Sequence, residues 1–178
     1  MRYRIGPTLI SAGDIQSRIR ELATAISEDY AGRDLLLLCV LKGAAIFWAD
    51  LCRALTVPSQ SDFVAMESYG DSTSPLEEPR FTKAADVALA NRDILIVEDI
   101  IDTGHTGAHL RALLQSQSPR SLAMCTLLDK AERREVLTPI EYCGFVIPNA
   151  FVVGYGLDFA QGFRYLPYIA TLEALHEA

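Results

Sequence analysis

Three carboxylates and a glycine turn follow one of the most apolar segments of the chain, ILIV at residues 94–97. The residues that could do chemistry here are Glu98, Asp99, Asp102, Thr103, Gly104, His105 and Thr106. Because glycine tolerates a positive φ, the backbone can turn at Gly104 and present its N–H groups. The threonine hydroxyls and the unsatisfied N-terminal amides of a following helix would add donors for an anion. The segment is therefore predicted to bind a phosphate group.

The carboxylates decide which phosphate ligand this turn suits. The segment lacks the lysine of a G-x-x-x-x-G-K-[ST] loop, which disfavours a nucleoside triphosphate. Glu98 and Asp99 would repel a phosphate unless they faced something else, and the vicinal hydroxyls of a ribose are suitable donors. A phosphorylated sugar satisfies both halves of the segment. Alternatively, such acids are only solvated or cap the next helix, but three of them beside a Thr-Gly-x-Thr turn favour a site.

The elements that must position these residues have the alternating pattern of an α/β fold. Apolar runs that indicate strands lie at residues 35–41, 62–67, 94–97, 122–128 and 151–153. Helices are predicted from Ile15, with Ser11 and Asp14 available as caps, and at residues 44–55 and 106–115. In a mostly parallel, open sheet, ligands gather beyond the carboxyl ends of the strands. The acidic segment must lie at that edge.

Composition limits the classes of protein that fit. The 178 residues, 50% of them hydrophobic, predict one domain, residues 1–178. No secretory signal is evident, and no run approaches the ~18 apolar residues that span a bilayer, so we expect a cytoplasmic protein without a membrane partner. The net charge of -7 argues against nucleic acid as a partner. We interpret the cysteines as free thiols rather than disulfides or zinc ligands; they are Cys39, Cys52, Cys125 and Cys143.

The segment ILIVEDIIDTGHT resembles the phosphoribosyl pyrophosphate signature of type I phosphoribosyltransferases, in the form found in the hypoxanthine-guanine branch. Five further segments match in the same order: LKG (41–43), SYG (68–70), LLDKAERR (127–134), FVVGYGLDF (151–159) and FR (163–164). The resemblance implies a mainly parallel sheet flanked by helices, a small hood built from terminal segments, and a mobile lid loop at about residues 68–90.

The resemblance also implies a reaction. Ribose 5-phosphate would pass from phosphoribosyl pyrophosphate to N9 of a 6-oxopurine, hypoxanthine and by extension guanine. The products would be IMP or GMP and pyrophosphate, Mg²⁺ would be required, and the protein would form a homodimer or homotetramer. Two alternatives stay open: a nucleotide-sensing or RNA-binding regulator on the same fold, and a receiver-like phosphotransfer domain that uses Asp99 or Asp102 as phosphoacceptor.

Roles for the acidic segment follow from the resemblance. Glu98 and Asp99 would bind the ribose hydroxyls and contribute to the Mg²⁺ site. The residues that would wrap the 5-phosphate are Asp102, Thr103, Gly104, His105 and Thr106. Asp102 also resembles the acid that faces the purine imidazole ring, where a carboxylate can take or share the proton displaced as the glycosidic bond forms. A helix N-cap role for Asp102 is compatible with this.

The other matching segments would complete the pyrophosphate side of the site. Leu41, Lys42 and Gly43 resemble the pyrophosphate loop, in which the peptide before the lysine is often cis. Arg164 would hold pyrophosphate through its guanidinium group. In the lid, Ser68 and Tyr69 would make contacts only in the closed state and so exclude water from the reacting carbon.

The purine pocket would come from the C-terminal third of the chain. Lys130 would donate to purine O6, Phe151 would stack on the ring, and the backbone of Val152 would contact the Watson–Crick edge. Asp158 would lie beside the purine and the pyrophosphate as a Mg²⁺ ligand or a ligand of its water. Without the resemblance, Lys130 and Lys42 would be interpreted as surface lysines and Phe151 as a core aromatic.

Overall fold

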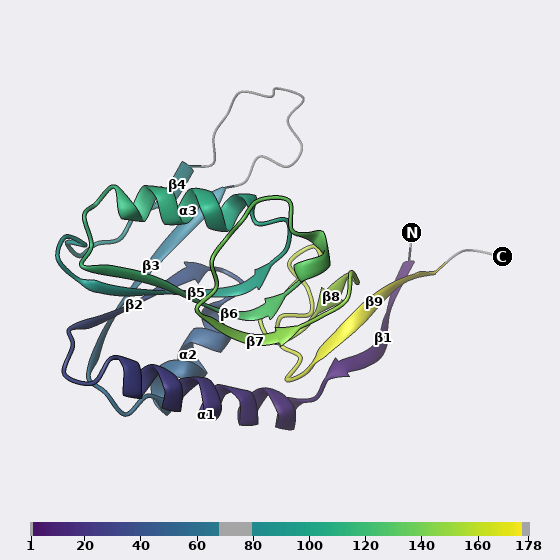
Figure 1. Ribbon diagram of the computed structural model, residues 1–178. Coiled ribbons are helices and arrows are strands. Elements are labelled where there is room, and N and C mark those ends of the chain that lie inside the picture. Colours follow the sequence, from purple (N-terminus) through teal and green to yellow (C-terminus); the bar gives the residue numbers. More distant parts are fainter. Residues whose placement is uncertain (1, 68–79, 176–178) are drawn as a thin grey trace.

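The computed structural model describes residues 2–67 and 80–175 (Figure 1). In chain order the elements are β1 (Arg2–Ile10), α1 (Ala12–Asp29), β2 (Leu35–Leu41), α2 (Ala45–Ala54), β3 (Ser59–Glu67), β4 (Arg80–Lys83), β5 (Asp93–Ile101), α3 (His105–Gln115), β6 (Ser121–Asp129), a 3-10 turn (Ala131–Arg133), β7 (Tyr142–Val146), β8 (Val152–Val153) and β9 (Ile169–Leu175).

A six-stranded sheet in the order β4-β3-β2-β5-β6-β7 forms the centre of the molecule. The pairs from β3 through to β7 are parallel, and only β4 runs antiparallel to its neighbour. Figure 1 shows α1 and α2 on one face of the sheet and α3 on the other. The predicted α/β fold with a mainly parallel sheet and flanking helices is therefore confirmed.

Alternation along β2 divides the core into two layers. Leu35 and Leu37 pack toward α1 and α2, whereas Leu36 and Leu38 pack toward α3. All four side chains are fully buried, and each contributes about 1.5–3 kcal/mol of hydrophobic stabilisation. Burial on both faces explains why this strand is a continuous aliphatic run in the sequence.

The first helix begins where its capping residues predict. The Oγ atom of Ser11 accepts a hydrogen bond from the backbone N–H of Asp14 at 3.1 Å, which satisfies one of the free amides of the first turn. The predicted apolar face is buried; its residues are Ile15, Ile19, Leu22, Ala23 and Ile26. This face packs against α2 and against strands β2, β5 and β6 of the sheet.

A second, three-stranded antiparallel sheet has the order β1-β9-β8. Its strands β1 and β9 come from the two ends of the chain and lie side by side in Figure 1, so the hood of terminal segments is confirmed. The strand predicted at residues 151–153 is present as β8, and it pairs with β9 in this sheet rather than with the main sheet. Strands β1, β7 and β9 were not predicted: β1 and β9 mix polar and apolar residues, and β7 is short and has a glycine at its centre.

The polar segment after β3 is only partly the loop that the sequence predicts. Residues Arg80–Lys83 form β4, and the buried carboxylate of Asp62 then accepts hydrogen bonds from the N–H groups of Asp86 and Val87 at 2.6 and 3.0 Å. Val87 and Leu89 pack on the α3 side of the core. The predicted lid of about residues 68–90 thus includes a strand and residues packed on the core in its second half, and its extent stays a prediction. The lid residues Ser68 and Tyr69 lie outside the described residues.

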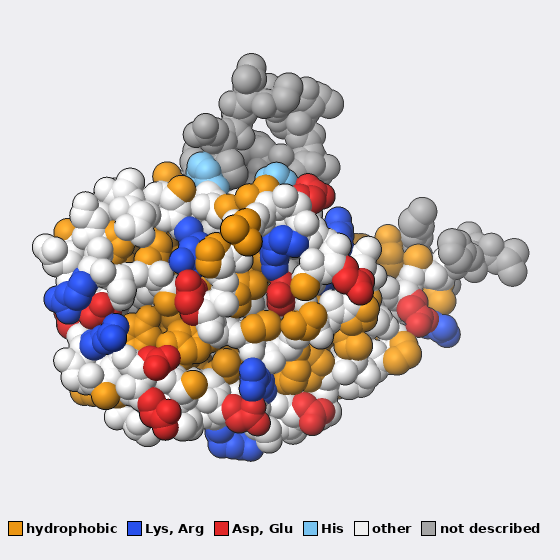
Figure 2. All heavy atoms as spheres, in the orientation of Figure 1, with side chains coloured by type: hydrophobic (Ala, Val, Ile, Leu, Met, Phe, Trp, Pro, Cys, Tyr) orange, Lys and Arg blue, Asp and Glu red, His pale blue; other side chains and the backbone are white. Residues whose placement is uncertain are grey.

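Side chains at the surface and the thiols complete the description. All four cysteines are free, and Cys39 and Cys125 are buried, as predicted. No helix among the described residues is long and apolar enough to cross a membrane. On the face drawn in Figure 2, Lys and Arg side chains are interspersed with Asp and Glu rather than gathered into one basic surface.

Candidate active site

Three backbone segments meet at the carboxyl end of β5, because glycines let them approach closely. A Cβ atom on Gly43 would overlap the carboxylate of Asp99, and a Cβ atom on Gly156 would overlap the carbonyl oxygen of Gly43. Gly156 has a φ of 101°, which favours glycine in any case. The turn after β2, the end of β5 and the segment after β8 are thus packed against one another, and the Leu41–Lys42 peptide bond in the first of them is cis.

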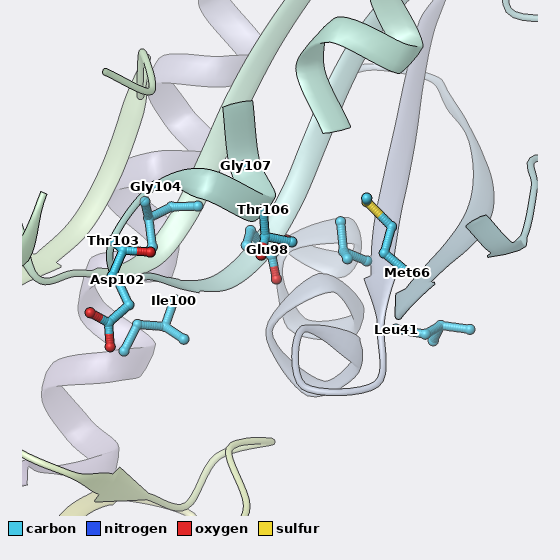
Figure 3. Close-up of a pocket in the computed structure, with 11 residues that line it drawn as sticks. Leu41, Met66, Glu98, Ile100, Asp102, Thr103, Gly104, Thr106 and Gly107 are labelled. Atoms are coloured by element: carbon cyan, nitrogen blue, oxygen red, sulfur yellow. The ribbon is translucent and has the colours of Figure 1, made fainter. Parts of the chain in front are cut away.

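A cavity of about 220 Å³ opens beside this meeting point. We call it the Glu98 cavity; its walls are Val40, Leu41, Met66, Glu98, Ile100, Ile101, Asp102, Thr103, Gly104, Thr106 and Gly107. Figure 3 shows Glu98 and Thr106 in the middle of the view, with the Asp102–Gly104 turn on one side and Leu41 and Met66 on the other. Most of the predicted phosphate-binding residues therefore line one cavity.

The turn into α3 is held from behind, which leaves its amides for a ligand. Gly104 has a φ of 94° and precedes the helix directly. The carbonyl oxygen of Thr103 accepts hydrogen bonds from the N–H groups of Glu135 and Val136 at 2.9 and 3.1 Å. The hydroxyl of Thr138 donates to the Gly104 carbonyl oxygen at 2.8 Å. With the carbonyls occupied and the first-turn amides lacking helical partners, the turn is a suitable anion site.

A second cavity, of about 260 Å³, adjoins the first and shares Ile100 and Asp102 with it. We call it the Lys130 cavity; its walls are Asp99, Ile100, Asp102, Lys130, Phe151, Val152, Leu157 and Asp158. The Phe151 side chain is 55% exposed and contacts Phe159 edge to face, with ring centroids 5.7 Å apart. An aromatic side chain that is half free at a cavity wall can stack on a planar ligand.

Asp102 joins the two cavities and is held by basic residues. The Nζ atom of Lys130 donates to Oδ2 of Asp102 at 3.1 Å, and the Lys130 side chain is only 8% exposed. Arg133 forms an ion pair with Asp102, in which its Nε atom lies 3.2 Å from Oδ1 and its Nη1 atom donates to Oδ2 at 3.5 Å. Arg134 donates to the Asp102 carbonyl oxygen at 3.0 Å and also pairs with Asp129. Two cations, Lys130 and Arg133, therefore orient the Asp102 carboxylate before a ligand binds.

Glu98 and Asp99 form a buried acidic pair. Burial raises the pKa of Glu98 well above its usual value, and the neighbouring charge of Asp99 raises it further. Burial also raises the pKa of Asp99, although the N–H of Ile100, at 2.8 Å from Oδ1, and the more distant Arg164 favour its charged form. Two adjacent carboxylates with raised pKa values form a site where a cation or hydroxyl donors would stabilise the charged forms.

Asp158, on the wall of the Lys130 cavity, forms an ion pair with Arg164, which lines neither cavity. The guanidinium of Arg164 lies 2.7 Å from Oδ1 of Asp158 and donates to the Gly156 carbonyl oxygen at 2.6 Å. Asp158 also accepts from the N–H of Gln161 at 2.8 Å. These contacts hold the guanidinium of Arg164 against Gly156, which in turn packs on Gly43.

Four of the predicted residues that the structure describes line neither cavity: Lys42, Gly43, His105 and Arg164. Lys42 is exposed, and His105 pairs with Glu135 at 3.0 Å on the surface, with 61% of its side chain accessible. The sequence reasoning did not assign roles to several wall residues: Val40, Met66, Ile100, Ile101, Gly107 and Leu157. It also missed the ion pair between Arg133 and Asp102, for which the only signal was the charge run AERR.

The family model of the phosphoribosyl transferase domain matches residues 11–160. The chain belongs to the phosphoribosyltransferase family. Its similarity extends to curated proteins of nearly the same length. It is 46% identical over 171 residues to the hypoxanthine phosphoribosyltransferase of Escherichia coli K12, covering 95% of this chain and 96% of the relative. It is 48% identical over 175 residues to the hypoxanthine-guanine phosphoribosyltransferase of Mycobacterium tuberculosis H37Rv, covering 95% and 87%.

Solved structures agree with the sequence comparison. A hypoxanthine-guanine phosphoribosyltransferase from Bacillus anthracis superposes with a TM-score of 0.90 at 39% identity, covering 97% of this chain and all of that one. The predicted type I phosphoribosyltransferase fold and the assignment to this enzyme family are therefore confirmed. A receiver-like phosphotransfer domain is set aside, since that alternative accounts for neither the hood nor the match.

Proposed function

We propose that this phosphoribosyltransferase transfers ribose 5-phosphate from phosphoribosyl pyrophosphate to N9 of hypoxanthine, and of guanine, giving IMP or GMP and pyrophosphate. The observation that carries the proposal is the pair of adjoining cavities that share Asp102. One has the acids and the amide-rich turn that suit a ribose phosphate, and the other has a buried lysine and a half-exposed phenylalanine that suit a 6-oxopurine. The names of the relatives support the choice of base.

In the Glu98 cavity, the turn from Asp102 to Thr106 would bind the 5-phosphate through its amides and the hydroxyls of Thr103 and Thr106. Glu98, and Asp99 from the wall of the adjoining Lys130 cavity, would accept hydrogen bonds from the ribose hydroxyls. Binding both ends of the sugar would fix its C1 atom between the cavities, and holding reactants in place converts a bimolecular step into an effectively unimolecular one. Arg164 and the backbone of Leu41–Gly43 would bind the leaving pyrophosphate.

In the Lys130 cavity, the ammonium group of Lys130 would donate to purine O6 while Phe151 stacks on the ring and the Val152 backbone contacts its edge. Asp102 would face the imidazole side of the purine. As N9 forms its bond to the sugar, the proton displaced from the ring would pass to the Asp102 carboxylate. When the base binds, Lys130 would exchange its present oxygen partner, Oδ2 of Asp102, for O6 of the purine.

The donor set also fits Mg²⁺. Glu98 and Asp99 are hard oxygen ligands whose raised pKa values reflect an uncompensated acidic pair, and Asp158 lies on the wall of the neighbouring cavity. The described residues contain no group of three side chains that could hold a metal alone. That agrees with a metal bound by one or two carboxylates and by substrate phosphates. When bound, Mg²⁺ would neutralise charge on the pyrophosphate.

A spectrophotometric screen of hypoxanthine, guanine, xanthine and adenine with phosphoribosyl pyrophosphate tests the proposal. We expect turnover with hypoxanthine and guanine, and its loss when Mg²⁺ is removed with a chelator. A chain that binds nucleotides but turns over none of the bases would instead be the regulator considered above. The cytoplasmic location, the single-domain organisation and the dimer or tetramer stay predictions.

A further inference from the structure

Tyr155 has a backbone conformation that residues other than glycine rarely adopt. It lies between Gly154 and Gly156, and the φ angles of the three residues are 103°, 50° and 101°. The ring is 4% exposed and belongs to the core cluster of α1 and α2. The backbone N–H of Tyr155 donates to the Leu166 carbonyl oxygen at 2.8 Å. A buried aromatic at the centre of such a tight turn indicates that the position of the turn is fixed by its side chain.

The hydroxyl of Tyr155 donates a hydrogen bond to the carboxylate of Asp50 on α2. Asp50 is 15% exposed, forms an ion pair with Arg53, and accepts from Nε2 of Gln16 on α1 at 2.9 Å. Burial tends to raise the pKa of Asp50, but the hydrogen bonds from Tyr155, Gln16 and Arg53 outweigh it and lower that pKa. Burial and the bond to Asp50 raise the pKa of Tyr155. The donor therefore stays protonated and the acceptor charged at neutral pH.

This contact lies between two parts of the pyrophosphate side of the site. Helix α2 begins at Ala45, two residues after Gly43, so Asp50 is on the element that follows the Leu41–Gly43 turn. Gly156, next to Tyr155, packs on the Gly43 carbonyl. Its N–H donates to the Arg164 carbonyl oxygen at 3.0 Å, and its own carbonyl oxygen accepts from the Arg164 guanidinium at 2.6 Å. The Gly154–Gly156 turn thus contacts α2 through the side chain of Tyr155 and Gly43 through the backbone of Gly156. It contacts both the backbone and the side chain of Arg164.

We propose that the Tyr155–Asp50 hydrogen bond is a positioning contact that clamps the Gly154–Gly156 turn onto α2 and so holds Gly43 and Arg164 in place for pyrophosphate. The proposal rests on the function proposed above. Neither residue lines a cavity wall, so the pair acts through the backbone that it holds and has no contact with the base. Loosening the contact affects the phosphoribosyl pyrophosphate side of the reaction and spares the purine side.

The test compares Tyr155→Phe with Tyr142→Phe, a matched control. Tyr142 also donates to a carboxylate, Oδ2 of Asp29 at 2.6 Å, but this contact joins β7 to the end of α1 and does not involve the turn or α2. Hydrogen exchange of peptides covering residues 41–45 is measured beside the KM values for phosphoribosyl pyrophosphate and hypoxanthine. We expect Tyr155→Phe to speed exchange at 41–45 and to raise KM for phosphoribosyl pyrophosphate about three- to tenfold, the effect of one lost hydrogen bond. KM for hypoxanthine should stay nearly constant, and Tyr142→Phe should change neither readout.

Asp50→Asn keeps an oxygen that accepts from Tyr155, so it should impair the enzyme less than Asp50→Ala does. The proposal is overturned if Tyr155→Phe lowers only the melting temperature, as Tyr142→Phe would, with exchange at 41–45 and both KM values unchanged. A wild-type chain that does not use phosphoribosyl pyrophosphate would refute the proposed function instead. The exchange measurement would still decide whether the clamp exists.

Discussion

The Nζ atom of Lys130 lies 3.1 Å from Oδ2 of Asp102, so the lysine proposed to bind the purine is paired with the acid proposed to receive its proton. The ammonium is almost fully buried and Arg133 adds a second cation beside the same carboxylate. Burying an unpaired charge costs several kcal/mol, so the Asp102 carboxylate compensates the buried charge of Lys130 until an oxygen of the base takes its place as partner. This arrangement couples the two residues, so a mutation of one also affects the other.

Asp102→Asn should lower turnover by ~10² to 10⁴, because the amide keeps the shape of the side chain but cannot accept the proton from the purine. Affinity for phosphoribosyl pyrophosphate should be largely retained, since in the proposed site the phosphate would be bound by backbone amides and threonine hydroxyls. Steady-state kinetics and calorimetric titration with phosphoribosyl pyrophosphate measure the two quantities. Wild-type turnover in this variant would remove Asp102 from catalysis.

Gly43→Ala should abolish most activity while the protein remains folded, because the new Cβ would push against the Asp99 carboxylate. A displacement of about 1 Å near reacting groups can cost ~10² in rate. Gly13→Ala in α1 is the control, since its Cβ would have only Ser11 Oγ nearby, at 3.8 Å. The contact between Gly43 and Asp99 would be irrelevant to catalysis if both variants had the same kcat.

We predict that Asp62 makes the stability of the protein, rather than its activity, depend on pH. Burial raises its pKa, but the N–H groups of Phe63, Val87 and Asp86 outweigh burial and hold the pKa below its usual value. A carboxyl group whose pKa is lower in the folded than in the unfolded protein stabilises the fold fully above its unfolded pKa, about 3.9. That stabilisation is lost as the pH falls through the folded pKa. Urea unfolding of wild type and Asp62→Asn should therefore differ at pH 6 and converge below about pH 4. A constant difference over that range would contradict the assignment.

How far the sequence predicts the molecule can be judged from particular residues. The aliphatic run of β2 is buried on both faces and the caps of α1 are local, so both were predictable. The position of β8 was not, because Val152 and Val153 would suit either sheet and only their pairing with β9 decides between them. Long-range partners also set β4 and the Asp62 contacts, which no local pattern indicates.

The candidate site follows the same rule. Glu98 to Thr106 form one continuous segment, so their shared cavity could be expected from the end of a parallel strand. The contact of Gly156 with Gly43 joins residues 113 positions apart, and in the sequence each is only one glycine among 11. The pairing of Arg133 with Asp102 depends on how the turn after β6 folds back, which the charge run AERR does not specify.

Lys130 provides the last prediction, which concerns the choice of base. Its ammonium has donors only, so in the proposed site it would pair with the oxygen at C6 of hypoxanthine but would face the amino group of adenine. A site built around a polar partner rejects an analogue that leaves it unpaired, so hypoxanthine should be preferred to adenine by at least ~10⁴ in kcat/KM.

Lys130→Ala should depress hypoxanthine use strongly and narrow this gap, because the variant no longer penalises the adenine amino group. It also frees Asp102 from its buried partner, so part of the loss in rate would come from a displaced carboxylate. The ratio of kcat/KM values for the two bases separates the effects, since displacement of Asp102 slows both reactions alike. An unchanged ratio in Lys130→Ala, or a wild type that uses adenine as well as hypoxanthine, would show that the base binds elsewhere.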